Sequence, residues 1–290
     1  MKHVRVYALR ISIALLLVSA GTLSFVSYGQ TTQSGDLVTV AFLDVGQGDA
    51  IFIEAPNGVQ MLIDAGPNQS ILKSLHEVMP YGDTTIDIVL ATHTDADHIG
   101  GLASVLDMYD VGQVIDNGMS SKTKIYSTVY SRIKEKDIPR SVAHKGMRIT
   151  LDREREVYMD ILFPDRDISG LSSNEGSIVS SLVYGTHTFL FTGDAPLYTE
   201  HIVLQNEDPL MIDSTVLKLG HHGSHTSTSD AWLRAVTPEL AIISAGKNNR
   251  YGHPHEDVLG RLRAFSVPYR ATYDEGTIVL KTDGVTMNTK

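Results

Sequence analysis

The sequence predicts an α/β fold in which two mixed β-sheets pack face to face, with helices on their outer sides. Short apolar segments bounded by glycine turns alternate with longer segments of helical apolar spacing. This mixture occurs in both halves of the chain without any repeated sequence. Hairpins that alternate with helices favour layered sheets, because each helix buries one apolar stripe against a sheet face. A length of 290 residues suits a single catalytic domain with this fold.

Three consecutive strands open the predicted domain. The turn Pro56-Asn57-Gly58 separates the second strand from the third and is a strong hairpin signal. Helical apolar spacing, a buried apolar run and a second helical segment follow. The strands are predicted at residues 37–43, 50–55, 59–63, 86–91 and 111–115, and the helices at 70–79 and 99–109.

The second half contains the same types of element. Apolar runs predict strands, and segments with an apolar residue every three or four positions predict helices. The turn Gly185-Thr186-His187 joins two of the strands, so His187 is expected at the surface. The strands are predicted at 157–163, 177–184, 188–192, 214–219, 240–244, 269–272 and 277–281, and the helices at 123–136, 196–207, 229–236 and 255–265.

The first 29 residues differ from the rest of the chain. Three basic residues precede the apolar run Ile11 to Ala20, and Ser27-Tyr28-Gly29 offers small residues at a cleavage site, so residues 1–29 predict an export signal. The alternative is an uncleaved membrane anchor, because Ile11 to Val26 is mostly apolar. Either reading places the linker at 30–36 and the domain at 37–290 outside the cytoplasm, secreted or tethered to the membrane.

Cysteine is absent, which excludes disulfides and thiolate zinc sites. Any metal ligand must therefore be His, Asp or Glu. The formal net charge of −10 argues against broad electrostatic capture of nucleic acid, although it leaves room for a local basic groove.

One hexapeptide concentrates potential metal ligands. In His93-Thr94-Asp95-Ala96-Asp97-His98, four such side chains stand within six residues, directly after the buried strand Ile86 to Ala91. Imidazole and carboxylate together suit Zn²⁺, Mn²⁺ or Fe²⁺, and a loop after a strand lets neighbouring side chains converge. The hexapeptide predicts a metallohydrolase.

Ligand-type residues recur at the ends of other predicted strands. Asp64 and Asp194 each end an apolar strand at a glycine turn, and His221-His222-Gly223-Ser224-His225 follows the strand Val216 to Leu219. These residues join the hexapeptide as candidates for one site.

The motifs and their order resemble the metallo-β-lactamase superfamily. Within it, the chain is similar to the hydrolase domain at the C-terminal end of ComEC competence proteins, over residues 37–280. The segments that carry the resemblance are Leu43-Asp44-Val45-Gly46-Gln47-Gly48-Asp49-Ala50, His93-Thr94-Asp95-Ala96-Asp97-His98-Ile99-Gly100-Gly101, Leu190-Phe191-Thr192-Gly193-Asp194, His221-His222-Gly223-Ser224 and Tyr251-Gly252-His253-Pro254-His255.

The resemblance implies an αββα sandwich with a two-metal site at one edge. His93 and Asp95 would then bind one divalent ion, Asp97 and His98 the other, and Asp194 would bridge them. One of His221 and His222 would complete the second ion's ligands, and His221 is favoured because it comes first after the strand. Asp64 would accept the far N–H of a ligating histidine.

Two departures from the superfamily pattern bear on the metal. Asp95 stands where many members carry His, and Asn174 and Ser177 occupy the region before Asp194 where a Gly-His pair is expected. The first site would be rich in oxygen ligands, which favours two ions of Mn²⁺ or loosely held Zn²⁺.

The expected chemistry uses water activated by two metal ions roughly 3.5–4 Å apart, with no side-chain nucleophile. Asp97, Asp64 and His253 are the expected catalytic residues, and His253 would protonate the leaving alkoxide or hold a nonbridging oxygen. Ser224 is expected to be structural or to contact phosphate. For Asp44 and Asp49 the sequence leaves two roles open, one in shaping the turn and one in catalysis.

The leading functional hypothesis is an exported phosphodiesterase or nuclease of ComEC-like type, with single-stranded DNA as one candidate substrate. The alternatives are a phosphocholine-type envelope esterase, a β-lactam or lactone hydrolase, and a non-catalytic binding module. No obligate protein partner is expected.

Overall fold

The computed structural model describes residues 35–289. The expected export signal or anchor at 1–29 lies outside these residues, as does most of the linker at 30–36. The chain from residue 37 onward forms one compact unit. Among the described helices, none has the length and apolar character needed to cross a bilayer.

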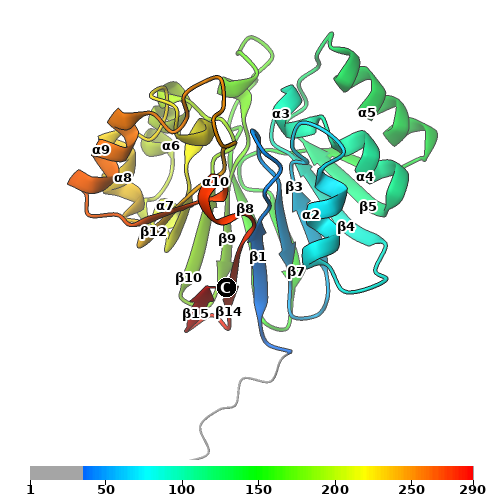
Figure 1. Ribbon diagram of the computed structural model, residues 1–290, viewed down its shortest axis with the longest axis horizontal. Coiled ribbons are helices and arrows are strands. Elements are labelled where there is room, and N and C mark those ends of the chain that lie inside the picture. The colour runs from blue at the N-terminus through cyan, green and yellow to red at the C-terminus, as the bar shows by residue number, and fades with distance from the viewer. Residues whose placement is uncertain (1–34, 290) are drawn as a thin grey trace, which may run out of the picture. The chain divides into compact units, whose positions relative to one another are not determined.

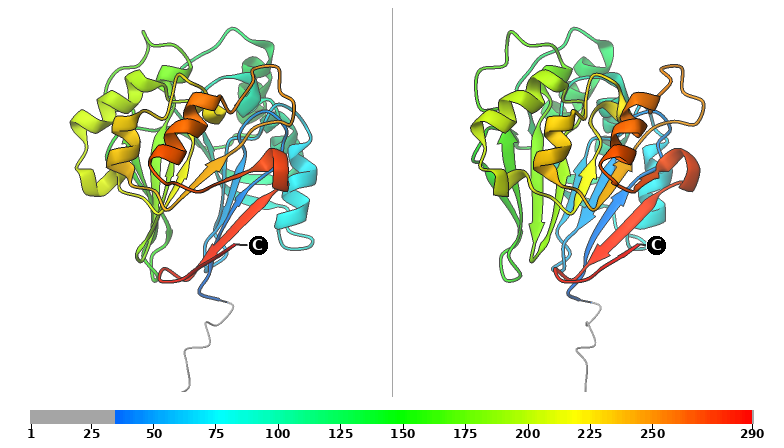
Figure 2. Two further views of the ribbon diagram at one scale, coloured as in Figure 1. Left: turned by 60° about the vertical axis from the view of Figure 1, so that its left-hand side comes forward. Right: turned by 90° about the vertical axis from the view of Figure 1, so that its left-hand side faces the viewer.

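Two mixed sheets face each other in this unit, and helices cover the outer side of each sheet (Figure 1). Figure 2 shows strands of the first sheet, in blue, cyan and red, facing the green and yellow strands of the second. The predicted αββα architecture is confirmed. In spatial order, the first sheet contains β15 (Met287–Thr289), β14 (Ile278–Thr282), β1 (Val38–Phe42), β2 (Ile51–Glu54), β3 (Gln60–Ile63), β4 (Thr85–Ala91), β5 (Asp110–Asp116) and β6 (Arg140–Val142).

The second sheet has the same mixture of parallel and antiparallel pairs. In spatial order it contains β13 (Tyr269–Ala271), β12 (Leu240–Ile243), β11 (Val216–Lys218), β10 (His187–Phe191), β9 (Val179–Tyr184), β8 (Val157–Phe163) and β7 (Arg148–Asp152). The helices are α2 (Ile71–Val78), α3 (Ala96–Ile99), α4 (Leu102–Met108), α5 (Lys124–Glu135), α6 (Leu197–Asn206), α7 (Pro209–Ile212), α8 (Asp230–Val236), α9 (Glu256–Ala264) and α10 (Thr272–Glu275).

The main core lies between the two sheets. Phe42 and Met61 of the first sheet and Phe189 and Phe191 of the second belong to it, and the rings of Phe42 and Phe191 have centroids 6.2 Å apart. A second cluster lies between the first sheet and α2, α4 and α5, and a third between the second sheet and α6, α8 and α9. Burial of each large apolar side chain in these clusters stabilises the folded state by about 1.5–3 kcal/mol.

The helix predicted over 99–109 is divided in the structure. α3 ends at Ile99 and α4 begins at Leu102, with Gly100 and Gly101 between them. A Cβ on either glycine would lie 2.1–2.2 Å from a backbone oxygen of the 65–67 segment. The glycine pair therefore lets the segment after the hexapeptide pack directly against the turn that follows β3.

The fold brings the ends of several strands to one edge. β3, β4 and β5 are parallel neighbours in the first sheet, and β10, β11 and β12 in the second. Parallel strands place their carboxyl ends at the same edge, where binding sites of open sheets form. The segments after β4, β10 and β11 carry the hexapeptide, Asp194 and the histidine pair, so the topology assembles the candidate site.

Candidate metal centre

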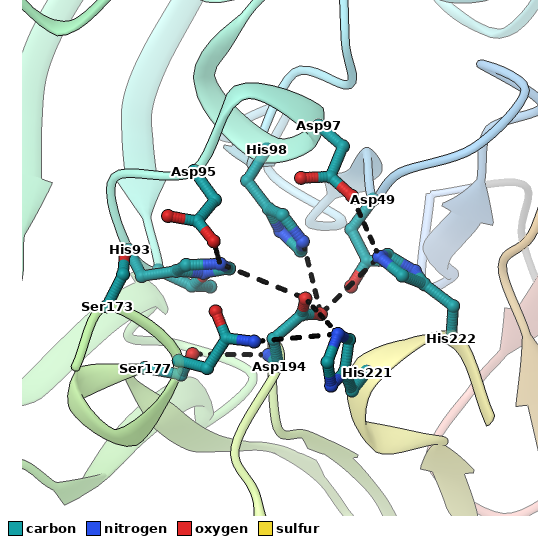
Figure 3. Close-up of polar contacts among 12 residues, drawn as sticks. Asp49, His93, Asp95, Asp97, His98, Ser173, Ser177, Asp194, His221 and His222 are labelled. Carbon is teal, nitrogen blue, oxygen red and sulfur yellow. Dashed lines mark hydrogen bonds and ion pairs between the residues drawn. The ribbon is translucent and has the colours of Figure 1, made fainter. Parts of the chain in front are cut away.

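The predicted ligand residues meet at this edge of the domain (Figure 3). The β4–α3 segment supplies the hexapeptide, the turn after β10 supplies Asp194, and the 3₁₀ turn Gly220–Gly223 after β11 supplies His221 and His222. They surround a pocket of about 140 Å³. Its lining residues are Gln47, Asp95, Asp97, Asp194, His221, His222, Tyr251 and His253.

Asp194 lies at the centre, and each of its carboxylate oxygens faces different donors (Figure 3). Oδ2 is 3.9 Å from His93 Nε2 and 3.6 Å from His221 Nε2. Oδ1 is 3.1 Å from His98 Nε2 and 3.5 Å from His222 Nε2. The carboxylate thus stands between two groups of imidazoles.

The two cluster aspartates follow the same division. Asp95 Oδ2 lies 3.9 Å from His93 Nε2, on the side of Asp194 Oδ2. Asp97 Oδ2 lies 3.4 Å from His222 Nε2, on the side of Oδ1. Each half of the site therefore offers two imidazoles and one carboxylate in addition to Asp194.

His221 and His222 lie on opposite sides of Asp194, which differs from the expectation that His221 joins Asp97 and His98. Both residues have left-handed backbone conformations, with φ of 48° and 57°. Consecutive residues in this turn direct their side chains apart, so that the buried His222 joins His98 while the partly buried His221 joins His93. The first half accordingly holds more imidazole than the sequence suggested.

Several donor atoms in the cluster are buried and make no hydrogen bond within the described residues. They are Nε2 of His93, His98 and His222, and Oδ1 of Asp49 and Asp194. Asp49, His98, Asp194 and His222 each bring one donor atom within 4.8 Å of the others. Buried polar atoms that lack partners are costly, and divalent cations bound at this cluster would give them partners. The residues fit a metal site.

The Nδ1 atoms of the same histidines do have partners. His93 Nδ1 lies 3.0 Å from Thr92 Oγ1, and His222 Nδ1 lies 3.0 Å from the Ser244 carbonyl oxygen. His98 Nδ1 lies 2.7 Å from Asp64 Oδ2. Partners at Nδ1 orient the rings and leave the Nε2 lone pairs facing the pocket.

Asp64 lies behind the donors and not among them. Its Oδ1 accepts from the Thr92 N–H at 2.8 Å, and its Oδ2 accepts from Thr92 Oγ1 at 2.6 Å and faces His98. This buried carboxylate orients His98 and raises the basicity of that imidazole toward a cation.

Asp49 and Lys218 form a buried ion pair that the sequence did not identify. Lys218 Nζ lies 2.6 Å from Asp49 Oδ2, while Asp49 Oδ1 lies 3.2 Å from His222 Nδ1. Burial opposes ionisation of Asp49, but the Lys218 ammonium and His222 hold the pKa of this carboxyl well below its ordinary value. Asp49 therefore belongs to the site, whereas Asp44 is exposed and accepts from the Gly46 N–H in the turn. In the sequence, Lys218 stands within the otherwise apolar segment 216–219, and this position could have indicated a buried lysine that needs a carboxylate partner.

The carboxylates make the half of the cluster that contains His98 and His222 attractive to positive charge. Burial opposes protonation of His222, but Asp194 and Asp49 raise the pKa of this imidazole to about 9. The pKa of His98 is also raised, against burial, by Asp194 and Asp64. A field that favours protons on these nitrogens also favours a divalent cation in their place.

His253 lies at the mouth of the pocket. Its ring stacks on Tyr251, with centroids 5.6 Å apart, and its Nδ1 is buried without a hydrogen bond among the described residues. Burial, then the neighbouring His222 and His221, lower the pKa of His253 to about 4. Near pH 7 the imidazole is neutral, with one N–H to donate.

Other residues singled out in the sequence lie beside the pocket. Ser177 Oγ accepts from the Asp194 N–H at 3.2 Å, and Asn174 Nδ2 lies 3.5 Å from His221 Nε2. Ser224 is buried, and its Oγ accepts from the Thr226 N–H. His255 immediately precedes α9, and its Nδ1 accepts from the His225 N–H at 3.0 Å.

Two mixed sheets flanked by helices, with imidazoles and carboxylates gathered at one edge, define a metal-dependent hydrolase fold. The family model described as "Metallo-beta-lactamase superfamily" matches residues 43–247, and the chain belongs to that superfamily. This confirms the resemblance found in the motifs.

Curated relatives include proteins named for the ComE operon and for recombination. The chain is 33% identical over 257 residues to ComE operon protein 3 of Bacillus subtilis, covering 82% of the chain and 32% of that protein. It is 28% identical over 282 residues to Recombination protein 2 of Haemophilus influenzae, covering 96% and 32%. The chain spans about a third of the length of these relatives.

A solved structure shows the same fold. YhfI of Bacillus subtilis, described as a metallo-beta-lactamase fold protein, aligns with a TM-score of 0.57 at 10% identity, covering 84% of this chain and 100% of YhfI. The fold is therefore common to chains whose sequences have diverged widely.

Proposed function

We propose that this protein is an exported phosphodiesterase that uses two divalent metal ions, with a single-stranded nucleic acid as its substrate. One observation carries the proposal: the Asp194 carboxylate stands between two matched groups of donors, one at each oxygen. Such an arrangement would hold two ions close together, as two-metal phosphodiesterase chemistry uses them.

The ligands divide between the two ions by their position around Asp194. His93, Asp95 and His221 would hold one ion, and Asp97, His98 and His222 the other. A Zn²⁺ or Mn²⁺ pair would supply hydroxide near neutral pH and offset the charge that develops on phosphoryl oxygens. Imidazole and carboxylate ligands accept either metal.

The remaining side chains hold and orient the reacting groups. Asp64 fixes the ring of His98 through its 2.7 Å contact, and the buried Asp49 lies 3.2 Å from His222 Nδ1. His253 is neutral near pH 7, so its N–H would donate to an oxygen of the substrate or leaving group. No serine or threonine lines the pocket, in keeping with attack by water.

The size of the pocket favours an extended substrate. A volume of about 140 Å³ is small beside the ~300–1,000 Å³ of sites that enclose whole drug-sized molecules. One phosphoryl group with its ester oxygens would enter, while the rest of the substrate would lie on the surface. A β-lactam or lactone ring system suits such a site less well. The name of the relative Recombination protein 2 also favours a DNA substrate.

Export rests on residues 1–29, whose basic and apolar segments are typical of a signal or anchor. Cell fractionation, with mass spectrometry of the mature N-terminus, separates a secreted form from a tethered one. Recovery of the full-length chain in the cytoplasm would contradict export.

The catalytic proposal is tested on purified protein loaded with Mn²⁺ or Zn²⁺. Substrates are bis-p-nitrophenyl phosphate, single-stranded and double-stranded DNA, phosphocholine esters and nitrocefin. We expect turnover of the phosphodiester and of single-stranded DNA. Preference for phosphocholine esters would indicate envelope chemistry, nitrocefin turnover a lactamase, and inactivity of metal-loaded protein a binding module.

A further inference from the structure

Three further residues line the pocket beside the proposed metal-binding residues, and we call them the second wall. The turn between β1 and β2 contributes Gln47 to it, and the loop between β12 and α9 contributes Tyr251 and His253. The proposed metal-binding residues carry carboxylates and imidazole lone pairs, whereas this wall carries amide, phenol and imidazole groups that can donate hydrogen bonds.

The orientation of the Gln47 amide is set by the backbone. Its Oε1 accepts from the Gly246 N–H at 3.1 Å, so the NH₂ group is directed away from Gly246. Nε2 is buried and makes no hydrogen bond within residues 35–289. An amide NH₂ only donates, so its missing partner is an oxygen acceptor and not a cation.

The loop that faces Gln47 is held in place. Asn249 Oδ1 accepts from the backbone N–H groups of Tyr251 at 3.1 Å and His253 at 3.0 Å. Asn249 Nδ2 donates to the Gly246 carbonyl oxygen at 2.9 Å. A Cβ on Gly246 would lie 2.8 Å from Gln47 N, so the two segments touch. The wall is therefore preorganised for a ligand.

Arg250 places a positive charge at the edge of this wall. Its guanidinium donates to the Tyr251 hydroxyl at 2.6 Å and lies 4.8 Å from the Tyr251 ring centroid. Most arginines of the described chain pair with a carboxylate, but Arg250 pairs with none there. A guanidinium that is held by a tyrosine and forms no ion pair with a carboxylate of the described residues suits an anion, and phosphate in particular.

We propose that Gln47 and Arg250 form a phosphate-recognition wall that selects a polynucleotide substrate. Gln47 donates to a nonbridging oxygen of the diester in the pocket, and Arg250 contacts the next phosphate along the strand. This inference rests on the proposed phosphodiesterase function and adds the residues that recognise the substrate.

The contribution of Gln47 is tested with inorganic phosphate as the ligand of metal-loaded protein, by calorimetry. Gln47→Glu keeps an acceptor for the Gly246 N–H but replaces the donor with a negative charge, and Gln47→Met removes both. We expect the Kd for phosphate to rise at least 10-fold in both variants while metal content per chain stays that of the wild type. Wild-type Kd values in both would overturn the assignment of Gln47.

The contribution of Arg250 is tested by binding of a fluorescent single-stranded oligonucleotide with a phosphorothioate backbone, which resists hydrolysis. We expect Arg250→Gln to raise Kd about 10-fold and to reduce the slope of log K against log salt by about 0.7. Arg153→Gln alters an exposed arginine between β7 and β8, in a segment that contributes no residue to the pocket, whereas the loop of Arg250 contributes Tyr251 and His253. The Kd and slope of Arg153→Gln should therefore equal those of the wild type.

The two proposals fail in different ways. Unchanged binding in Arg250→Gln, or equal losses in both arginine variants, would overturn the recognition wall even if the enzyme hydrolyses diesters. Retained effects on phosphate and oligonucleotide binding, with no diester hydrolysis by wild-type protein, would instead overturn the proposed catalytic function.

Discussion

The Asp49–Lys218 ion pair is a buried contact that supports the candidate metal site. Both side chains are almost completely inaccessible to solvent, and Asp49 also contacts the imidazole of His222. A buried charge without its partner is strongly destabilising, whereas a neutral pair of similar shape is tolerated. Lys218 therefore compensates the negative charge of Asp49, which lies beside the proposed metal ligand His222.

Replacing Lys218 by methionine should lower the free energy of unfolding by about 3–5 kcal/mol, because Asp49 would remain buried and unpaired. The double variant Asp49→Asn with Lys218→Met should recover much of this loss. Urea unfolding of the wild type, both single variants and the double variant measures the coupling. Additive effects of the two substitutions would contradict it.

Asp64→Asn should weaken metal binding about 10- to 100-fold, because the carboxylate that orients His98 is lost while every proposed ligand remains. Competition with a chelating dye measures the affinity. Asp44→Asn, in an exposed turn, is the matched control and should bind metal as the wild type does. Equal affinities in the two variants would remove the role assigned to Asp64.

Asp97→Ala, His98→Ala and Asp194→Ala should each abolish phosphodiester hydrolysis while the fold is retained, since each removes a proposed ligand. Activity assays together with near-ultraviolet circular dichroism separate lost chemistry from lost structure. Wild-type turnover by any of these variants, at equal metal content, would contradict the ligand assignment.

At the scale of elements, the turn between β1 and β2 is pressed against the start of α3. The Asp49 N–H donates to the Asp97 carbonyl oxygen at 3.2 Å, and a Cβ on Gly48 would lie 2.1 Å from that oxygen. Gly48 has φ of 137°, a conformation that suits glycine. This contact sets the position of Asp49 relative to the hexapeptide.

Gly48→Ala should cost more than about 3 kcal/mol of stability, because backbone strain adds to the collision with Asp97. Gly46→Ala is a matched control in the same turn. Gly46 also has positive φ, of 79°, but a Cβ there meets no atom within 4 Å. Gly46→Ala should therefore lower the free energy of unfolding by only about 1 kcal/mol. Chemical denaturation of both variants tests this, and similar losses would exclude the close approach as the cause.

Sequence reasoning succeeded where elements have a regular apolar pattern, and the strand at 157–163 matches β8 throughout. It missed β6 and β7, whose residues are partly exposed at sheet edges and include Arg140 and Arg148. It identified the histidines and aspartates that gather around Asp194, because few residue types can bind a metal. The opposite directions of His221 and His222 depend on two left-handed backbone conformations, which spacing does not reveal.

At the scale of the whole domain, the site joins the two sheets. The hexapeptide follows β4 of the first sheet, and Asp194 and the histidine pair follow β10 and β11 of the second. The motifs alone implied that these segments meet. The Asp49–Lys218 contact could not be predicted, because it depends on how the two sheets pack.

Metal should stabilise the folded domain against heat. Saturation to 100 times Kd adds about 2.7 kcal/mol, so Tm should rise when Mn²⁺ or Zn²⁺ is added and fall when a chelator removes it. Differential scanning calorimetry measures both shifts. The metal-dependent change in Tm should disappear in Asp194→Ala. If metal does not change the Tm of the wild type, the proposed metal site is wrong.

Because each sheet contributes ligands, a bound ion would cross-link the two layers at the edge where their loops meet. Stripping the ion would leave that end of the sandwich joined by the Asp49–Lys218 ion pair, the Gly246–Gln47 hydrogen bond and the apolar interior. Amide hydrogen exchange should then accelerate first in the segments around residues 93–98 and 192–195, long before the central strands open. Occupancy by metal would thus regulate the rigidity of the catalytic edge as well as its chemistry.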